Sequence, residues 1–278
     1  LVFAYQWQAS RDGVVWTNIS GATSATFNPD DDEVGQQLRA VAAYTDGQGT
    51  EESVTSEATA AVSNINDTPV DFVVSVSGSA IEDGTLTASA SVTSDADGLP
   101  DPLVFAYQWQ ASSDGVVWAD INGATSASFT PGDAEVGLRL RAVAAYTDGQ
   151  GTEESAPSEP TAAVLNVNDD PVAADDEFTT GEASSVGGNL LADNGNGVDS
   201  DPDDNTLTVL SVEGDTDGTV TLASGAIVTF QTDGTFSYDP NGAFDALSTG
   251  ETGTDSFDYL ISDGQGGTDQ ATATVTIS

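Results

Sequence analysis

Apolar and polar side chains alternate over short stretches along most of this chain. Clear cases are residues 85–93 (TLTASASVT), 219–230 (TVTLASGAIVTF) and 269–278 (DQATATVTIS). A period of two sends successive side chains to opposite faces, which is the pattern of a half-buried β-strand. No stretch shows the period of about 3.6 residues that marks an amphipathic helix. The pattern therefore predicts an all-β chain.

Asp-Gly pairs interrupt these stretches, as at Asp46-Gly47, Asp148-Gly149 and Asp233-Gly234. The pair favours a tight hairpin turn, because such turns need backbone angles that glycine and aspartate tolerate. Many short strands joined by closely spaced turns are typical of antiparallel β-sandwiches. We expect tandem antiparallel β-sandwiches in an extended array.

The strongest signal is an internal repeat. Residues 1–70 align without a gap on residues 103–172, and 16 of the 70 positions differ. Copies this similar indicate a tandem array of one structural unit. For the second copy, together with the segment before it, the alternation predicts strands over residues 72–79, 84–93, 103–112, 116–121, 126–130, 138–147 and 153–165.

Three domains follow from this alignment. Residues 71–102 precede the second copy, whereas Leu1 has no such segment before it. We therefore expect residues 1–70 to form a repeat that lacks its N-terminal strands, and residues 71–171 to form a complete one. Residues 172–278 do not follow the offset, and we expect them to form a third sandwich of another type.

Four tryptophans are candidates for core positions or for sugar stacking. Trp109 lies in the middle of an expected strand, where a sandwich core accommodates one large ring, and Trp7 is its copy. Trp16 and Trp118 each follow an Asp-Gly turn, which places them at the end or edge of a sheet. Packing explains all four positions, and carbohydrate binding stays open as the alternative.

Charge and composition exclude several classes of protein. The chain has 46 acidic and four basic side chains, a formal net charge of −42, and no lysine, histidine, cysteine or methionine. Nucleic-acid binding needs a cationic surface, and zinc, haem or iron–sulfur sites need His or Cys ligands. Ser-His-Asp triads and disulfides are excluded in the same way. Carboxylate pairs of the glycosidase type occur everywhere by composition alone, so we expect no enzyme.

Composition also bears on the location of the chain. No run of about 18 apolar residues occurs, so we expect no insertion into a membrane. The missing methionine suggests an internal or processed segment of a longer protein.

Two stretches resemble known families. FAYQWQASSDGVVWADINGATSASFTPGDAEVGLRLRAVAAYTDG, followed by an NVNDDPV junction, resembles the bacterial Ig-like repeats of giant RTX-type secreted adhesins. Residues 172–278 resemble the cadherin-like VCBS repeats of the same proteins, through AADDEFTT, DSDPDDNTLTVLSV and GTDSFDYLISDGQGGTDQATATVTI. The resemblance implies Ig-like and cadherin-like sandwiches in an extracellular stalk that Ca²⁺ stiffens. It also implies type I secretion and a secreted or cell-surface location.

Clustered Asp and Asn side chains suggest calcium, which takes six to eight oxygen ligands and needs neither His nor Cys. The first candidates are the two junctions with the pattern N-x-N-D-x-P, which carry Asn64, Asn66 and Asp67, and Asn166, Asn168 and Asp169. These junctions are similar to the cadherin interdomain linker. That similarity implies an added acidic residue from the domain that follows, Glu82 or Asp83 after the first junction and Asp176 or Glu177 after the second. A solvated linker is the alternative.

Two acidic loops are further calcium candidates. The first holds Asp95, Asp97 and Asp101, with Gly98 permitting a sharp turn. The second holds Asp199, Asp201, Asp203 and Asp204. Two unit charges about 5 Å apart repel by roughly 3 kcal/mol at an effective dielectric constant near 20, and a divalent cation would reverse that repulsion. An ordinary acidic turn is the alternative in both cases.

The function expected from the sequence is that of a non-enzymatic, calcium-rigidified stalk or extender segment of a large secreted or cell-surface adhesin. Its partners would be neighbouring repeats of the same chain, and a cell-surface glycan or protein. A carbohydrate- or protein-binding module, or an accessory array of a secreted enzyme whose catalytic domain lies elsewhere, are the alternatives. Acidity that serves only solvation at high salt would compete with the calcium interpretation.

Overall fold

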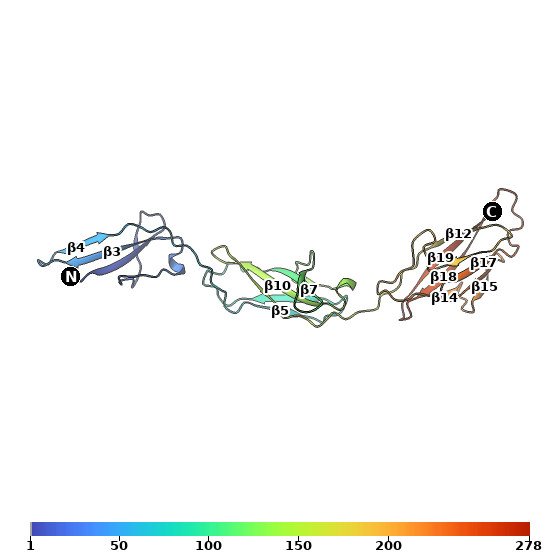
Figure 1. The fold of residues 1–278 in the computed structure, drawn as a ribbon, viewed down its shortest axis with the longest axis horizontal. Coiled ribbons are helices and arrows are strands. Elements are labelled where there is room, and N and C mark those ends of the chain that lie inside the picture. The colour runs from blue at the N-terminus through green and yellow to red at the C-terminus, as the bar shows by residue number, and fades with distance from the viewer. Residues whose placement is uncertain (1) are drawn as a thin grey trace. The chain divides into compact units, whose positions relative to one another are not determined.

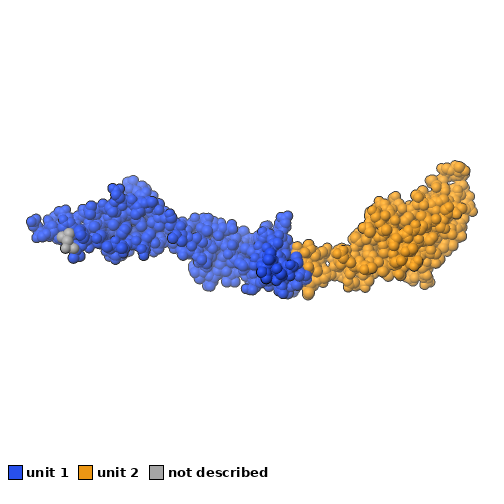
Figure 2. Space-filling view, in the orientation of Figure 1, with its two compact units in different colours: residues 1–80, 84–131, 137–164 blue, residues 81–83, 132–136, 165–278 orange. Residues whose placement is uncertain are grey.

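The structure is a computed structural model that describes residues 2–278, and these residues form nineteen β-strands and two short 3-10 turns. No helix in this part of the chain is long and apolar enough to cross a membrane. The predicted all-β class is confirmed. The chain folds into two compact units, shown in Figure 2. Unit 1 comprises Leu1–Ala80, Gly84–Pro131 and Gly137–Val164, and unit 2 comprises Ile81–Asp83, Gly132–Val136 and Leu165–Ser278.

The first repeat, in unit 1, forms one antiparallel sheet in the order β2-β1-β3-β4 (Figure 1). Its strands are β1 Ala4–Ser10, β2 Thr17–Asn18, β3 Gln37–Thr45 and β4 Glu51–Thr55. Trp7 of β1 lies opposite Ala40 of β3, and Ala9 lies opposite Leu38. Because directly opposed residues share a face, these four side chains lie on one side of the sheet.

The second repeat, also in unit 1, has the same sheet in the order β11-β10-β7-β8 and adds a sheet in the order β5-β6-β9. The strands are β5 Val73–Ser77, β6 Leu86–Ser91, β7 Ala106–Ser112, β8 Ala119–Asp120, β9 Ser128–Phe129, β10 Arg139–Thr147 and β11 Glu153–Pro157. All seven strands predicted for this repeat are present, and the last ends earlier than expected. The sheets enclose Leu86, Trp109 and Leu140, all fully buried, so Trp109 fills the core as predicted.

Trp16 and Trp118 pack against arginine. The guanidinium carbon of Arg39 lies 4.2 Å from the ring centroid of Trp16, and that of Arg141 lies 4.3 Å from Trp118. Both rings are half-buried beside the edge strands β2 and β8. This cation–π contact accounts for both rings as parts of the fold.

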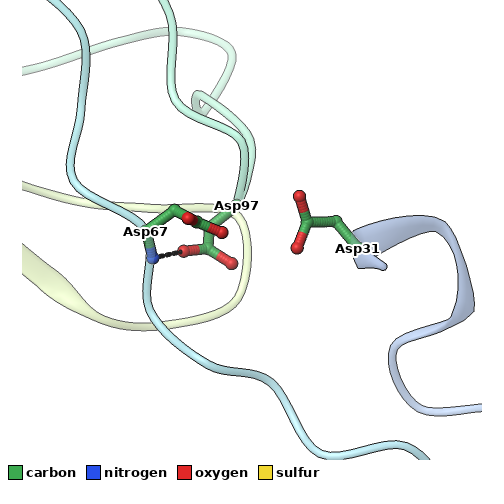
Figure 3. Close-up of side chains that lie close together, drawn as sticks. All are labelled: Asp31, Asp67 and Asp97. Carbon is green, nitrogen blue, oxygen red and sulfur yellow. Dashed lines mark hydrogen bonds between the residues drawn. The ribbon is translucent and has the colours of Figure 1, made fainter. Parts of the chain in front are cut away.

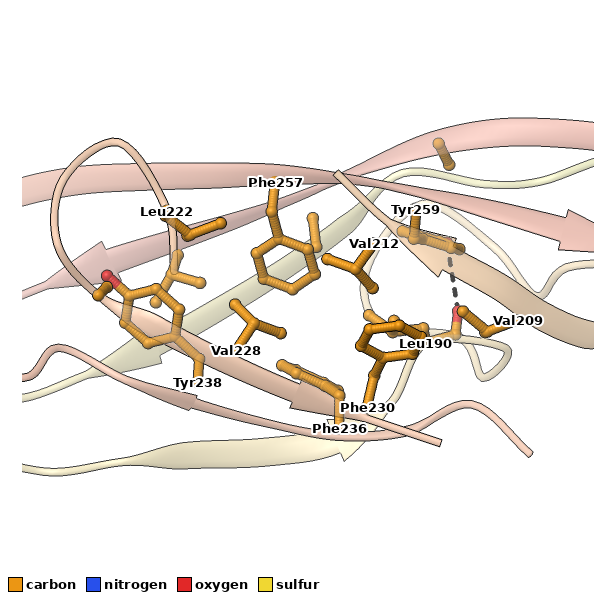
Figure 4. Packing of buried hydrophobic residues seen from close by; sticks show 14 of the residues in the cluster. Leu190, Val209, Val212, Leu222, Val228, Phe230, Phe236, Tyr238, Phe257 and Tyr259 are labelled. Atoms are coloured by element: carbon orange, nitrogen blue, oxygen red, sulfur yellow. Dashed lines mark hydrogen bonds between the residues drawn. The ribbon is translucent and has the colours of Figure 1, made fainter. Parts of the chain in front are cut away.

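The third domain, in unit 2, is a sandwich of two four-stranded sheets, β12-β19-β18-β14 and β13-β17-β16-β15. Its strands are β12 Asp176–Thr180, β13 Val186–Asn189, β14 Thr208–Val212, β15 Thr219–Thr221, β16 Ile227–Phe230, β17 Thr235–Asp239, β18 Gly253–Ser262 and β19 Thr268–Ile277. Figure 4 shows Phe236, Tyr238, Phe257 and Tyr259 pointing into the space between the sheets, where all four are buried. Strand β12, the first of this domain, pairs in parallel with the last strand, β19, and forms one edge of their sheet.

Candidate metal centres

Three aspartates of unit 1 converge at the first junction. Asp31, Asp67 and Asp97 each offer one carboxylate oxygen, and these oxygens lie within 4.8 Å of one another. Figure 3 shows their carboxyl groups facing a common space, with Asp31 on a turn of the first repeat, Asp67 on the linker and Asp97 on a loop of the second repeat. Segments far apart in sequence thus supply one acidic group.

Local structure fixes the position of Asp31. It begins the 3-10 turn η1, Asp31–Glu33, which Asp30 caps by accepting a hydrogen bond from the Asp32 N–H at 3.2 Å. The Glu33 carboxylate accepts one from the Asp30 N–H at 3.2 Å. This reciprocal capping holds the turn and so presents Asp31 toward the linker.

Backbone hydrogen bonds hold the other two aspartates together. The Asp67 N–H donates to Asp97 Oδ2 at 2.6 Å, and the Asp97 N–H donates to Asp95 Oδ1 at 3.0 Å. The loop then turns at Gly98, whose φ is +93°. A Cβ on Gly149 would lie 2.6 Å from the Asp97 carbonyl oxygen, so only glycine fits there. The close contact brings the turn after Asp148 against this loop.

The three carboxylates of the first group repel one another. Burial raises the pKa of Asp31, and the charges of Asp67 and Asp97 raise it further. The Oδ1 atom of Asp97 is buried without a hydrogen-bond partner, as is Oδ2 of Asp148 and Oδ1 of Asn64. Buried polar atoms are nearly always satisfied, so these three atoms call for a ligand such as a cation or ordered water.

The second group has the same construction and lies within unit 2. Glu82, Asp169 and Asp203 bring carboxylate oxygens within 4.8 Å of one another. The Asp169 N–H donates to Asp203 Oδ2 at 2.8 Å, and the Asp203 N–H donates to Asp201 Oδ1 at 2.9 Å. These two bonds reproduce those made by Asp67, Asp97 and Asp95 in the first group.

Glu82 joins this group from the turn between β5 and β6. Its N–H donates to the Leu165 carbonyl at 2.9 Å, and its Oε2 accepts from the Val167 N–H at 2.9 Å. That second bond lowers the pKa of Glu82, but contact with Asp133, burial and the charge of Asp169 outweigh it, and the pKa is raised. The other oxygen, Oε1, is buried without a partner.

Asp133 belongs to the same neighbourhood and begins the 3-10 turn η2, Asp133–Glu135. Burial raises the pKa of Asp169, and the charges of Asp133 and Asp203 raise it further. Oδ2 of Asp201 is a further buried oxygen without a partner. The carboxylates that crowd the second junction are thus those of Glu82, Asp133, Asp169 and Asp203.

The donor set fits calcium. Both groups offer carboxylate oxygens, and in the first an amide oxygen of Asn64 is unpartnered nearby in sequence. Calcium is bound by such hard oxygen ligands, whereas zinc and copper favour nitrogen and sulfur, which this composition cannot supply as His or Cys. A divalent cation would also relieve the like-charge repulsion in each group.

Some of the residues predicted as ligands from the sequence lie in these two groups. Asp67, Asp97, Glu82, Asp169 and Asp203 were all predicted as ligands and lie in a carboxylate group. Glu82, however, was expected beside the junction at residues 64–69 and instead lies with Asp169. The reason is that its turn pairs with the end of its own repeat, through the bridge between Ile81 and Leu165.

The remaining predicted residues fall into three sets. Asp95 and Asp201 are buried beside the groups, where each anchors a loop through its Oδ1. Asn66 and Asn168 use their amides to donate to Glu154 at 2.5 Å and to Asp263 at 2.6 Å. Neither carboxylate group includes the following residues: Asn64, Asn166, Asp83, Asp101, Asp176, Glu177, Asp199 and Asp204.

Asp176 and Asp199 form a buried site of their own inside the third domain. Asn194 donates to Asp176 Oδ1 at 2.9 Å, and the Ala174 N–H donates to Asp199 Oδ1 at 2.8 Å. The Tyr259 hydroxyl donates to the Ala174 carbonyl at 2.7 Å and lies 3.5 Å from Asp199 Oδ2. These carboxylates are thus built into the domain. Asp176 was predicted as a ligand at the second junction and Asp199 as a ligand in the acidic loop, and neither lies in the carboxylate group at that junction.

Asp31, Asp133 and Asp148 were missed by sequence reasoning. A signal for the first two was present, since Asp31 and Asp133 are the same in both copies of the repeat while the residue after each changes from Asp32 to Ala134. An acidic residue that is the same in both copies, beside a position that differs, is therefore a candidate ligand. Asp148 gave no such signal, because its Asp-Gly pair is fully explained as a turn.

Two sequence families match the chain. Residues 168–278 match the family described as bacterial cadherin-like domain. Residues 3–64 and 75–164 match a family described as a domain of unknown function (DUF8696), so the repeats, which make up over half of the chain, belong to that family. The cadherin-like resemblance of the third domain is confirmed.

Several solved structures match the chain at low sequence identity and low TM-score. Human mucin-like protocadherin EC1-2 is 16% identical, with 74% of this chain and 98% of that chain covered and a TM-score of 0.33. A 1.5-MDa bacterial ice-binding adhesin is 14% identical, with 100% and 88% covered and a TM-score of 0.24. A Ca²⁺-stabilised adhesin of an Antarctic bacterium is 16% identical, with 100% and 66% covered and a TM-score of 0.27. No curated protein matches the sequence.

Proposed function

We propose that this chain is a non-enzymatic extender segment of a larger secreted or cell-surface adhesin, and that calcium stiffens its junctions. The observation that carries the proposal is the recurrence of one acidic construction at both junctions. In each, a linker aspartate donates its N–H to the carboxylate of a loop aspartate. In each, buried carboxylate oxygens also lack partners.

The ligands in this proposal are Asp31, Asp67 and Asp97 at the first junction, and Glu82, Asp133, Asp169 and Asp203 at the second. A cation held there is contacted at once by a linker residue and by loops from other parts of the chain. The cation therefore adds a restraint on the linker to that of its backbone hydrogen bonds. A bacterial cadherin-like third domain fits an extracellular location of the segment.

The expected energies are large enough to matter. Extracellular calcium modules bind with dissociation constants of about 10⁻⁴ to 10⁻³ M. At a hundredfold excess of calcium, one site adds roughly 2.7 kcal/mol to the free energy of unfolding. Two such sites approach the total stability of a small domain, about 5–15 kcal/mol. Calcium would then stabilise a chain that has no disulfides.

The first test is thermal unfolding of the whole chain in CaCl₂, MgCl₂ and NaCl at matched ionic strength. All four tryptophans lie in the two repeats, so their fluorescence follows these, while calorimetry also detects the third domain. We expect millimolar calcium to raise the unfolding temperatures, and magnesium and sodium to have much smaller effects. An equal rise with sodium would show that the acidity serves solvation alone.

Substitutions locate the effect. Asp97→Asn and Asp203→Asn each remove one carboxylate from a group, and each should weaken calcium binding about tenfold or more, which is about 1.4 kcal/mol per tenfold. Asp71→Asn and Asp204→Asn are matched controls, because both residues are exposed and have the positive φ that asparagine tolerates. Calcium affinity that falls equally in the controls would contradict these sites.

A further inference from the structure

One face of the first sheet is less covered than the same face in the second repeat. In the second repeat Trp109, Ala142 and Ala144 have no exposed surface, and Tyr146 is 4% exposed. Their counterparts Trp7, Ala40, Ala42 and Tyr44 are only half-buried, and nearby Phe3 is 45% exposed. The same side chains thus have different neighbours in the two repeats.

The strand pair β5–β6 covers this face in the second repeat. Phe72, just before β5, has its ring centroid 5.7 Å from that of Phe105 and 5.3 Å from that of Tyr146. The counterparts of Phe105 and Tyr146 are Phe3 and Tyr44, whose rings already lie edge to face at 5.7 Å. Two rings of a three-ring cluster are therefore in place in the first repeat.

An unpaired backbone edge lies beside this face. In the second repeat Leu86 and Thr87 of β6 pair with β9, and the Ala88 N–H donates to the Ala127 carbonyl at 2.7 Å. The counterpart of β9, residues 26–27, forms no strand in the described chain.

This edge is nevertheless held in position. The Trp7 indole donates to the Ser24 carbonyl at 3.0 Å, and its ring lies 5.8 Å from that of Phe27. The second repeat has the matching contacts, at 3.0 Å from Trp109 to Ser126 and 5.6 Å between the rings of Trp109 and Phe129. Residues 26–27 are therefore held by the same contacts as the segment that pairs with β6 in the second repeat.

The first carboxylate group also lacks a residue that segment 71–102 supplies to the second group. Glu82 completes the second group, and it belongs to the turn between β5 and β6. The first group contains the aspartates Asp31, Asp67 and Asp97 and no glutamate. The face, the edge and the acidic group of the first repeat thus all match one segment, residues 71–102.

We propose that the first sheet is the docking face for a further copy of segment 71–102. Its strand pair closes the sandwich over Phe3, Trp7 and Tyr44, its second strand pairs with residues 26–27, and its glutamate joins the first carboxylate group. The glutamate step rests on the calcium function proposed above, whereas docking of the strands does not.

The test adds the segment in two ways. A peptide of residues 71–102 is mixed with the full chain, and in a second protein the same segment is placed directly before Leu1, since residue 102 joins residue 103, the counterpart of Leu1. Hydrogen exchange at the amide of Phe27 is then measured, because its counterpart Phe129 lies directly opposite Leu86 of β6. We expect exchange to slow about tenfold or more, as it does when an exposed edge becomes paired.

Two variants of the added segment separate docking from calcium. Leu86→Asp puts a charge at a fully buried position and should abolish the protection. Glu82→Gln should keep the protection but lose the gain in calcium affinity at the first group that the unmodified segment gives. Protection without that gain in the unmodified segment would refute the glutamate step and leave the docking intact.

Two outcomes would overturn the docking. One is unchanged exchange at the Phe27 amide in the chain that carries the segment before Leu1, where weak binding of a free peptide is no explanation. The other is a dimer of the full chain, seen by sedimentation, that buries this face and persists when the segment is attached. That dimer would make a second copy of the chain the occupant.

Discussion

Asp176 is 1% exposed in the third domain, and its Oδ2 has no hydrogen-bond partner. Burial, together with the charges of Asp199 and Asp175, raises its pKa to about 6, although the hydrogen bond from Asn194 opposes the shift. The ordinary value is 3.8. Between these two values the folded domain keeps a proton that the unfolded chain has lost.

This difference sets the sign of a pH effect. A raised carboxyl pKa favours the folded state at low pH, and that contribution is lost as the pH rises through about 6. A shift of roughly two units corresponds to at most about 3 kcal/mol. We expect Asp176→Asn to gain stability relative to the parent as the pH rises from about 4 to 7, as measured by calorimetry in the presence of chelator.

The control for this prediction is Glu177→Gln, which removes an exposed carboxylate from the same strand. It shows how much of the change follows from the loss of one negative charge in so acidic a chain. A stability difference between Asp176→Asn and the parent that stays constant across this pH range would contradict the buried charge as its cause.

The sequence shows which residues have the chemistry of calcium ligands, but not which of these residues lie together. The acidic loop at residues 95–97 and the linker Asp67 were predicted from their spacing alone. Their meeting with Asp31 depends on how the turn η1, between β2 and β3, lies against the linker, which no local pattern encodes. The pairing of Glu82 with Asp169 was missed for the same reason.

Among the elements, the two copies of one strand offer a matched comparison. Trp109 on β7 is fully buried between two sheets, whereas Trp7 on β1 is half-buried on a single sheet. Trp109→Ala should cost about 3–5 kcal/mol, as is usual for a large buried ring, and Trp7→Ala should cost less. Hydrogen exchange at the amides of β1 and β7, measured over a denaturant series, reports on each repeat separately.

Equal losses in the two variants would mean that the first sheet buries its tryptophan as completely as the second in solution. Such a result would also count against a free docking face on the first repeat. The comparison is sharp because the strand AYQWQAS is identical in both copies, so local propensity cancels.

The elements themselves were largely predictable. Alternation and Asp-Gly turns located every strand of the second repeat, because each strand has one buried face. The parallel pairing of β12 with β19 was not predictable, since it joins the first and last strands of the third domain. Period-two patterns identify strands but not their partners, and partners come from packing between distant segments.

For the whole molecule, the repeat offset explains why two junctions share one chemistry. Asp31 and Asp133 are 102 residues apart, as are Asp67 and Asp169, so duplication of the repeat duplicates half of each site. The other half comes from the domain that follows, through Asp97 and through Asp203. Two different domain types thus present an aspartate carboxylate to the same kind of linker, as the proposed binding of one kind of cation requires.

This shared construction leads to the last prediction, on the conformations of the whole chain. If an ion at each junction restricts its linker, small-angle X-ray scattering should show a narrower distribution of maximum dimensions in calcium than in chelator. The double variant Asp97→Asn/Asp203→Asn should scatter in calcium as the parent does in chelator, and Asp71→Asn/Asp204→Asn should scatter as the parent does in calcium. Identical profiles with and without calcium, in a parent that calcium stabilises thermally, would show that the ions stabilise the domains without stiffening the chain.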